Sequence, residues 1–352
     1  MGDNVVAAKT CDLVCEGGGV KGIGLAGAFA GLEEAGYAPK RVAGTSAGAI
    51  TAALIAAGYS AAELKEIVLS LDFRQFEDKG WEDRIPLLGN PLSILLDQGV
   101  YEGEKFLDWM RGMLIEKEVF TFGHLKTGSD DPRYAYRLQV IVSDISARRL
   151  LVLPRDAAVL GLDPDKLEVA LAVRMSMSIP LFFEPVRIEN QQTNWQHVLV
   201  DGGMLSNFPV WLFDSDGPPE VPTFGLLLVE PDPKTPITER LPKPEHSPKG
   251  VKGFVQLLSG MVHTMMEAHD RLYVEKAQFA RTIGIPTLGV GTTEFGIPRG
   301  RALELYESGR KAAQDFLAGW NFDAYVAEFR TGKEHSRRDE IAQELQQVAA
   351  TT

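Results

Sequence analysis

Ser46 lies in a sequence setting that could make its hydroxyl a nucleophile. The segment Gly44-Thr45-Ser46-Ala47-Gly48 matches the G-x-S-x-G pattern, in which a sharp turn between a strand and a helix exposes the serine side chain. Because the chain contains 35 glycines among 352 residues, the letters alone leave an ordinary turn open as an alternative. A short apolar strand before the segment and an apolar helix after it favour the nucleophile.

A glycine-rich segment, EGGGVKG at residues 16–22, follows the first apolar strand and precedes a helix. It formally satisfies G-x-G-x-x-G, but the second predicted strand lacks the carboxylate that should bind a ribose, and the glycine spacing of a phosphate-binding P-loop is absent. What remains is a row of backbone N–H groups, on Gly17, Gly18 and Gly19, at a helix N-terminus that favours negative charge. We interpret it as an anion-binding turn, with a plain strand-to-helix turn as the alternative.

A third motif, Asp201-Gly202-Gly203, follows the predicted strand 198–200. Sites of α/β proteins form at strand ends, so a carboxylate here could enter a site while the glycines let the chain turn away. The plain alternative is an aspartate that caps a turn.

The histidines and cysteines lack the setting of a catalytic base or a metal ligand. An α/β-hydrolase places several strands before its serine and an acid and a histidine after it, whereas one strand and the glycine-rich segment precede Ser46. His197 is the hardest to dismiss, because it directly precedes a strand. Cys11 and Cys15 lie too far apart along one strand for a disulfide and lack zinc-site partners. We therefore expect neither a metal nor an organic cofactor.

The order of strand, glycine-rich segment, helix, strand, serine turn, helix and later Asp-Gly-Gly resembles the patatin-like phospholipase family. The resemblance covers about residues 11–316 and includes RMSMSIPLFF at 174–183. It implies that Ser46 is the nucleophile, that Asp201 is its only partner and general base, and that residues 17–19 form the oxyanion hole. No histidine takes part in such a Ser-Asp dyad.

One position departs from the family pattern, because Glu16 stands where the family often has aspartate. We expect little effect, since the backbone acts at this turn. The remaining motif glycines are expected to support these turns: Gly22, Gly44, Gly48, Gly202 and Gly203.

The resemblance implies a serine lipid acyl hydrolase, such as a phospholipase A, that works through an acyl-enzyme. Because an aspartate of ordinary pKa is a weak base at neutral pH, the site must raise the pKa of Asp201 by burial or by keeping cations away. A soluble carboxylesterase or thioesterase is an alternative. A nucleotide-binding regulatory module that uses the glycine-rich turn is a more distant one.

The elements that must position these residues alternate between strand and helix, which is typical of an α/β fold. Several strands are continuous apolar runs, as expected where both faces of a sheet are covered. We expect one three-layer patatin-like domain over residues 9–320, with a mostly parallel central sheet and helices on both faces. Residues 321–352 are expected to be a helical or partly disordered tail. The predicted strands are 13–15, 41–43, 137–142, 150–153, 198–200 and 224–229, and the predicted helices are 23–35 and 47–57.

Three other segments add expectations. Residues 72–103 are apolar but irregular and could form a lid. Residues 230–250 are rich in proline and carry lysine and arginine, which favours an exposed connector or a basic patch for phospholipid headgroups. Apolar residues recur at helical spacing over 254–272, which predicts a buried helix face.

Composition excludes several classes of protein. The formal net charge of −12 disfavours nucleic acid as a partner. The start of the chain lacks the pattern of a secretory signal, and no apolar run is long enough to cross a bilayer. We expect a cytoplasmic protein whose partner is a lipid or ester substrate and whose membrane contact, if any, is peripheral. The oligomeric state is not readable from the sequence.

Overall fold

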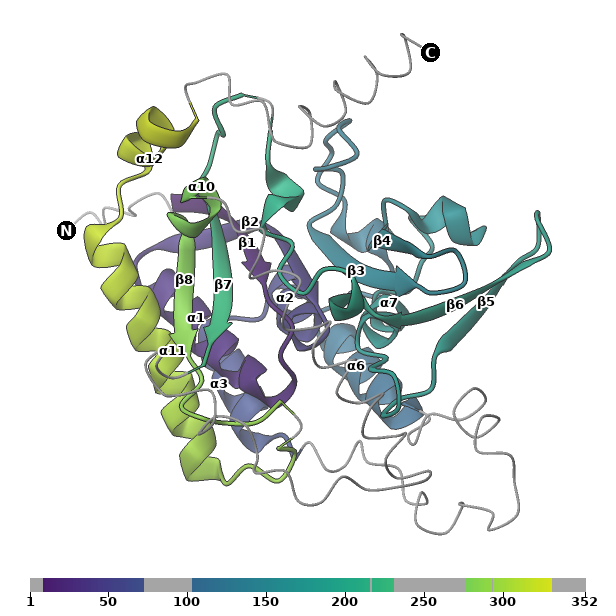
Figure 1. Ribbon diagram of the computed structural model, residues 1–352, viewed down its shortest axis with the longest axis horizontal. Helices are drawn as coiled ribbons and strands as arrows, with labels where there is room; N and C mark the ends of the chain where they lie inside the picture. Colours follow the sequence, from purple (N-terminus) through teal and green to yellow (C-terminus); the bar gives the residue numbers. More distant parts are fainter. Residues whose placement is uncertain (1–8, 73–102, 216, 231–275, 293, 331–352) are drawn as a thin grey trace, which may run out of the picture.

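The computed structural model describes residues 9–72, 103–215, 217–230, 276–292 and 294–330 (Figure 1). In this part of the chain no helix combines the length and the apolar character needed to cross a bilayer. Several predicted features lie wholly or mostly outside the described residues: the lid segment 72–103, the proline-rich segment 230–250, the helix over 254–272 and the tail beyond 330.

Within the described residues, eight strands form one sheet in the order β5-β6-β3-β2-β1-β7-β8, with β4 paired to β3. All six predicted strands are present, most of them longer than predicted. The strands are β1 (Lys9–Cys15), β2 (Tyr37–Thr45), β3 (Leu138–Asp144), β4 (Arg149–Leu153), β5 (Val186–Asn190), β6 (Trp195–Asp201), β7 (Thr223–Val229) and β8 (Thr282–Pro286).

The two predicted helices also form, and the second has the predicted bounds. The α-helices are α1 (Ile23–Glu34), α2 (Ala47–Ala57), α3 (Ala61–Ser70), α6 (Glu104–Glu116), α7 (Val169–Ser176), α10 (Lys276–Phe279), α11 (Arg299–Gly319) and α12 (Phe322–Phe329). Helix α12 is the described part of the predicted tail.

The sheet is parallel in its centre and antiparallel at one end. Strands β3, β2, β1, β7 and β8 pair in parallel, because helical or long connections carry the chain back between them. Strands β4 and β6 run antiparallel to β3, and β5 runs antiparallel to β6. The predicted mostly parallel α/β sheet flanked by helices is therefore confirmed. Strands β5 and β8, which are short and partly exposed, were not predicted from the sequence.

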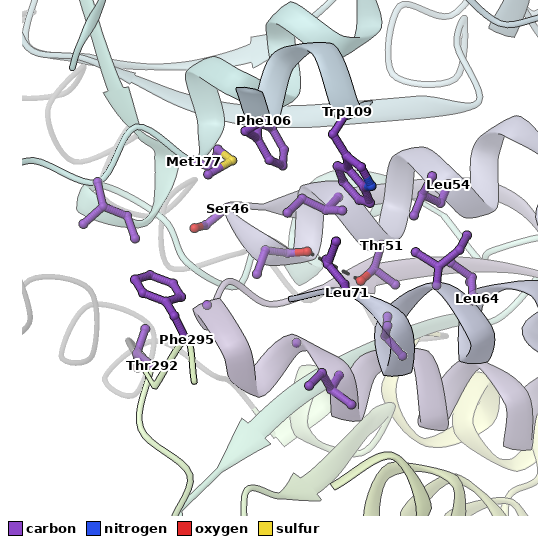
Figure 2. Close-up of a pocket in the computed structure, with 18 of the residues that line it drawn as sticks. Ser46, Thr51, Leu54, Leu64, Leu71, Phe106, Trp109, Met177, Thr292 and Phe295 are labelled. Atoms are coloured by element: carbon purple, nitrogen blue, oxygen red, sulfur yellow. Dashed lines mark hydrogen bonds between the residues drawn. The ribbon is translucent and has the colours of Figure 1, made fainter. Parts of the chain in front are cut away.

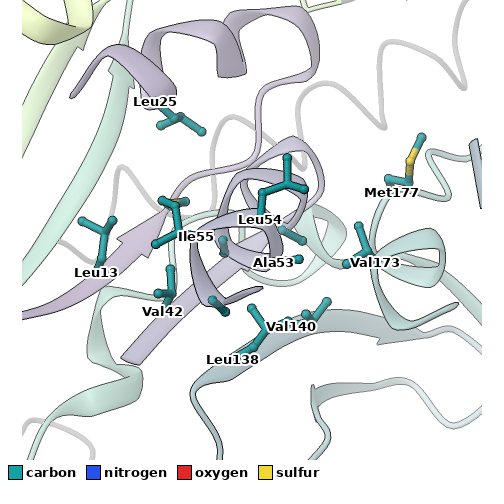
Figure 3. Packing of buried hydrophobic residues seen from close by; sticks show 14 of the residues in the cluster. Leu13, Leu25, Val42, Ala53, Leu54, Ile55, Leu138, Val140, Val173 and Met177 are labelled. Carbon is teal, nitrogen blue, oxygen red and sulfur yellow. The ribbon is translucent and has the colours of Figure 1, made fainter. Parts of the chain in front are cut away.

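Side chains alternate between two apolar layers along the central strands. Leu13 and Val42 face the larger core, to which α1, α2, α7 and α11 contribute. Figure 3 shows side chains of α2, such as Leu54, among those of the strands and of α7. On the opposite face, Val14 and Ala43 join a smaller cluster. The short 3-10 helix η6 (Val210–Phe213) supplies Leu212 and Phe213 to that cluster.

Helices α1 and α11 pack closely because glycine lies at their contact. A Cβ added at Gly27 would collide with the main-chain oxygen of Tyr306, whereas a Cβ added at Gly112 on α6 would meet no atom within 4 Å. We expect Gly27→Ala to lower the free energy of unfolding by about 1 to 3 kcal/mol through overpacking. Gly112→Ala should raise it by about 0.5 to 1 kcal/mol through helix propensity. Urea unfolding measures both, and equal effects would contradict this packing.

Candidate active site

Ser46 occupies a strained turn between β2 and α2. Its φ of 52° and ψ of −125° lie in a region that residues with a side chain rarely adopt, and such strain is typical of functional sites. The residue is buried, and its N–H donates to the hydroxyl of Ser176 at 2.9 Å. The structure therefore gives Ser46 the sharp turn that its sequence setting predicted.

The glycines around Ser46 allow a close approach of two backbones. A Cβ at Gly48 would collide with the main-chain oxygens of Cys15 and Glu16 at the end of β1. A Cβ at Gly44 would in turn collide with the main-chain oxygen of Gly48. Helix α2 can therefore begin directly against the end of β1, next to the glycine-rich segment.

The sheet brings Asp201 to the same place. Thr45 pairs with Ile141 on β3, and the next residue of β3, Val142, pairs with Asp201 at the end of β6. Because β4 also pairs with Ile141 and Val142, it occupies the opposite edge of β3, and β2 and β6 meet end to end along one edge. Ser46, directly after β2, and Asp201, the last residue of β6, therefore lie at facing strand ends, where their side chains can approach each other.

The Asp201 carboxyl is fully buried and sparingly hydrogen-bonded. Its Oδ1 accepts from the N–H of Gly203 at 2.7 Å. Within the described part of the chain, Oδ2 has no partner at hydrogen-bond geometry, although the nearby hydroxyl of Ser46 still acts on the carboxyl to lower its pKa. Contacts of this kind are often long before substrate binds. The hydroxyl of Ser46 is thus close enough to act on the Asp201 carboxyl.

Burial raises the pKa of Asp201 to about 7, against the opposing effects of the Ser46 hydroxyl and the Gly203 N–H. Removal from water disfavours the charged carboxylate, and here this effect exceeds the two opposing effects. A carboxyl with a pKa near 7 can both take and return a proton at neutral pH.

The glycine-rich segment differs in one respect from its predicted role. The N–H of Gly17 donates to the main-chain oxygen of Asn207 at 3.1 Å, and Asn207 Nδ2 donates back to the Gly17 oxygen at 3.0 Å. Gly17 is therefore not available as an oxyanion donor. The N–H groups of Gly18 and Gly19 donate to no described residue. Gly19 has a φ of +56° and lines the cavity that also holds Ser46.

The other glycines of the predicted motifs take supporting positions. An added Cβ at Gly22 would contact Ala47, directly after the serine. At Gly202 it would collide with the main-chain oxygen of Ile141 on β3. Gly203 supplies the N–H that binds Asp201. These contacts link the three motifs into one cluster.

An apolar cavity extends from Ser46 between α2, α3 and α6 (Figure 2). Ile50 and Leu54 follow Ser46 at intervals of one helical turn and line the same side. Figure 2 shows Ser46 and Leu54 in different parts of the cavity, with Leu64 beside Leu54. Among the described lining residues there is no charged side chain and no histidine. The lining also includes Ile67, Val68, Leu71, Phe106, Trp109, Met177, Ile179, Phe183, Thr292 and Phe295.

His197 and the cysteines take the structural positions that the sequence favoured. His197 Nδ1 lies 2.6 Å from Asp144 Oδ2, and both side chains are buried in the sheet. Cys11 and Cys15 are buried free thiols. Over the described ranges, no group of three or more His, Cys, Asp or Glu could hold a metal ion.

Comparison with known proteins places this arrangement in a family. The sequence model of the patatin-like phospholipase family matches residues 13–214, more than half of the chain. The chain belongs to the patatin-like phospholipase family. All the residues singled out in the three motifs lie within the matched range.

Two relatives and one solved structure show how far the likeness extends. The uncharacterized protein YqhO of Bacillus subtilis is 37% identical over 311 residues, which cover 88% of this chain and 99% of YqhO. An uncharacterized NTE family protein of Mycobacterium tuberculosis is 29% identical over 214 residues, or 60% of this chain and 30% of that protein. The crystal structure of VipD from Legionella pneumophila shares the fold, with a TM-score of 0.53, 16% identity and coverage of 91% of this patatin-like chain and 67% of VipD.

The residues that hold the motifs in place were not predicted from the sequence. Ser176 binds the backbone of Ser46, and Asn207 binds both backbone groups of Gly17. Glu16, expected to matter little, accepts from the N–H of Leu228 at 2.5 Å and from Asn207 Nδ2 at 3.3 Å. Ser176 lies within the family-like segment, which was a usable signal. Asn207 carries no signal that one sequence could reveal.

Proposed function

We propose that this patatin-like protein hydrolyses carboxylic esters of lipids, with Ser46 as nucleophile and Asp201 as general base. The observation that carries the proposal is a strained serine facing a fully buried aspartate of pKa about 7, at the edge of an apolar cavity. Family membership supports lipid hydrolysis in general.

The proposed reaction has two halves. Ser46 Oγ attacks the ester carbonyl carbon while its proton passes to Asp201 Oδ2. The N–H groups of Gly18 and Gly19 stabilise the oxyanion, each donor contributing roughly 10² to 10³-fold to the rate. Collapse of the tetrahedral intermediate breaks the bond to the alcohol, which takes the proton back from Asp201. Water then attacks the acyl-enzyme, gives a proton to Asp201 and releases the fatty acid and Ser46 in its starting form.

The cavity supports an acyl chain as the group next to the reacting carbonyl. Eight residues of helical rise separate Ser46 from Leu54, a length of about 12 Å, and apart from the hydroxyls of Ser46, Thr51 and Thr292 the described lining is predominantly apolar. Burial of each methylene contributes about 0.8 kcal/mol to binding. The predominantly apolar lining, without a charged side chain among its described residues, speaks against the nucleotide-binding alternative, because several phosphate charges need compensating cations. A soluble ester with a medium-length chain remains the competing substrate class.

A fluorophosphonate probe tests the nucleophile, because it reacts only with an activated serine. We expect one covalent adduct, on the peptide that contains Ser46. With p-nitrophenyl esters, kcat/KM should rise about three- to four-fold for each added methylene until the cavity is filled. Labelling at another residue, or none, would contradict the proposal. Hydrolysis of short-chain esters but not of phospholipid vesicles would favour the soluble esterase alternative.

A further inference from the structure

The backbones of both proposed catalytic residues are bonded to one short segment, residues 176–178. The N–H of Ser46 donates to the hydroxyl of Ser176 at 2.9 Å. The N–H of Asp201 donates to the main-chain oxygen of Ser178 at 2.9 Å. This segment lies at the end of α7, outside the three motifs.

Ser176 also connects the serine turn to the sheet. Its hydroxyl donates to the main-chain oxygen of Ile141 at 2.6 Å while accepting from Ser46. Ser176 is fully buried, so water cannot replace it. Without the hydroxyl, a buried N–H and a buried carbonyl would both lose their partner. One hydroxyl therefore holds the strained backbone of Ser46 against β3, the strand with which Asp201 also pairs.

The segment itself is braced from a third side. The Ser178 hydroxyl donates to the main-chain oxygen of Arg174 at 2.9 Å, and the guanidinium of Arg174 donates to that hydroxyl and to the main-chain oxygen of Glu184. Arg174 and Ser178 are buried. A braced segment can set a distance, whereas a mobile one could not.

We propose that residues 176–178 are a positioning element that sets the separation of Ser46 Oγ and Asp201, with the Ser176 hydroxyl as its contact to the nucleophile. The proposal rests on the proposed dyad. Without the Ser176 hydroxyl, Ser46 relaxes toward an ordinary backbone conformation. In its strained conformation no other described residue accepts a hydrogen bond from its N–H. Its Oγ then moves relative to the carboxylate and to the N–H groups of the glycine-rich segment.

Ser176→Ala tests the element. We expect kcat to fall by about 10²-fold, the scale on which a misplacement of about 1 Å acts, with KM nearly unchanged because Ser176 does not line the cavity. The rate of fluorophosphonate labelling should fall in parallel. Ser176→Cys keeps a weak donor and acceptor and should give an intermediate kcat. It also provides a second test should the alanine variant fold poorly.

Ser308→Ala is the matched control. Ser308 lies on α11, and its hydroxyl donates to the main-chain oxygen of Pro286 at 2.8 Å. Its kcat should equal that of the wild type. The proposal is overturned if folded Ser176→Ala keeps kcat within about two-fold of wild type, or if only KM changes.

A crystal structure of Ser176→Ala separates this inference from the proposed function. We expect the Ser46 φ to leave the positive range. If φ stays near its present value, the positioning role is wrong even where activity is lost. If φ shifts but the wild-type protein neither hydrolyses esters nor reacts with the probe, the dyad is wrong and the positioning contact stands.

Discussion

Ser46→Ala is expected to abolish ester hydrolysis and fluorophosphonate labelling while leaving the fold intact. The substitution removes the only atom that forms the acyl bond, and we expect kcat to fall by at least about 10³-fold, because the remaining site can only polarise a substrate for attack by water. Alanine keeps the Cβ, the backbone strain and the N–H bond to Ser176. The free energy of unfolding should therefore change by less than about 1 kcal/mol.

Steady-state kinetics on a p-nitrophenyl ester, labelling with the probe and urea unfolding together check this prediction. Ser308→Ala serves again as the control, since it removes a serine hydroxyl elsewhere in the fold. Undiminished turnover by a folded Ser46→Ala protein would show that the nucleophile lies elsewhere.

Asp201→Asn should produce the second largest loss of activity. Asparagine cannot accept the proton of Ser46, and loss of a general base lowers rates by about 10² to 10⁴-fold.

Wild-type kcat/KM should rise with pH and level off above about pH 8, because the pKa of Asp201 is about 7. The residual activity of the variant should lack this step. A wild-type profile that is flat from pH 5 to 9 would contradict the assignment of Asp201.

The raised pKa of Asp201 also predicts that the free energy of unfolding falls as the pH rises, whereas activity rises over the same range. The pKa of Asp201 is raised from 3.8 to about 7 in the folded protein, so the folded state holds a proton that the unfolded state has lost between these values. This contribution to stability is complete below about pH 4 and is lost as the pH rises through 7. From pH 5 to pH 8 it removes about 3 kcal/mol. Asp201→Asn should lose less stability than the wild type over this range, and urea unfolding at both pH values measures the difference.

The serine turn could be predicted because its requirements are local. Gly44, Ser46 and Gly48 lie within five residues, and glycine is required at position 44 by the main-chain oxygen of Gly48 in the same turn; only the contact of Gly48 with the end of β1 is distant in sequence. The central parallel strands could be predicted for a similar reason, since continuous apolar runs are what strands buried on both faces require. Strands β5 and β8 were not predicted, because their partly exposed residue pattern does not differ from that of a loop.

The amino-acid sequence by itself determined which groups could react: a serine between glycines, a glycine-rich turn and an aspartate after a strand, in an order that identifies the family. Only the tertiary structure decided how they are used. Sheet order sets Asp201 beside Ser46, burial sets the pKa of Asp201, and Asn207 removes Gly17 from the donors. The physical reason is that these properties depend on hydrogen bonds and loss of water among residues distant in sequence, which local patterns do not record.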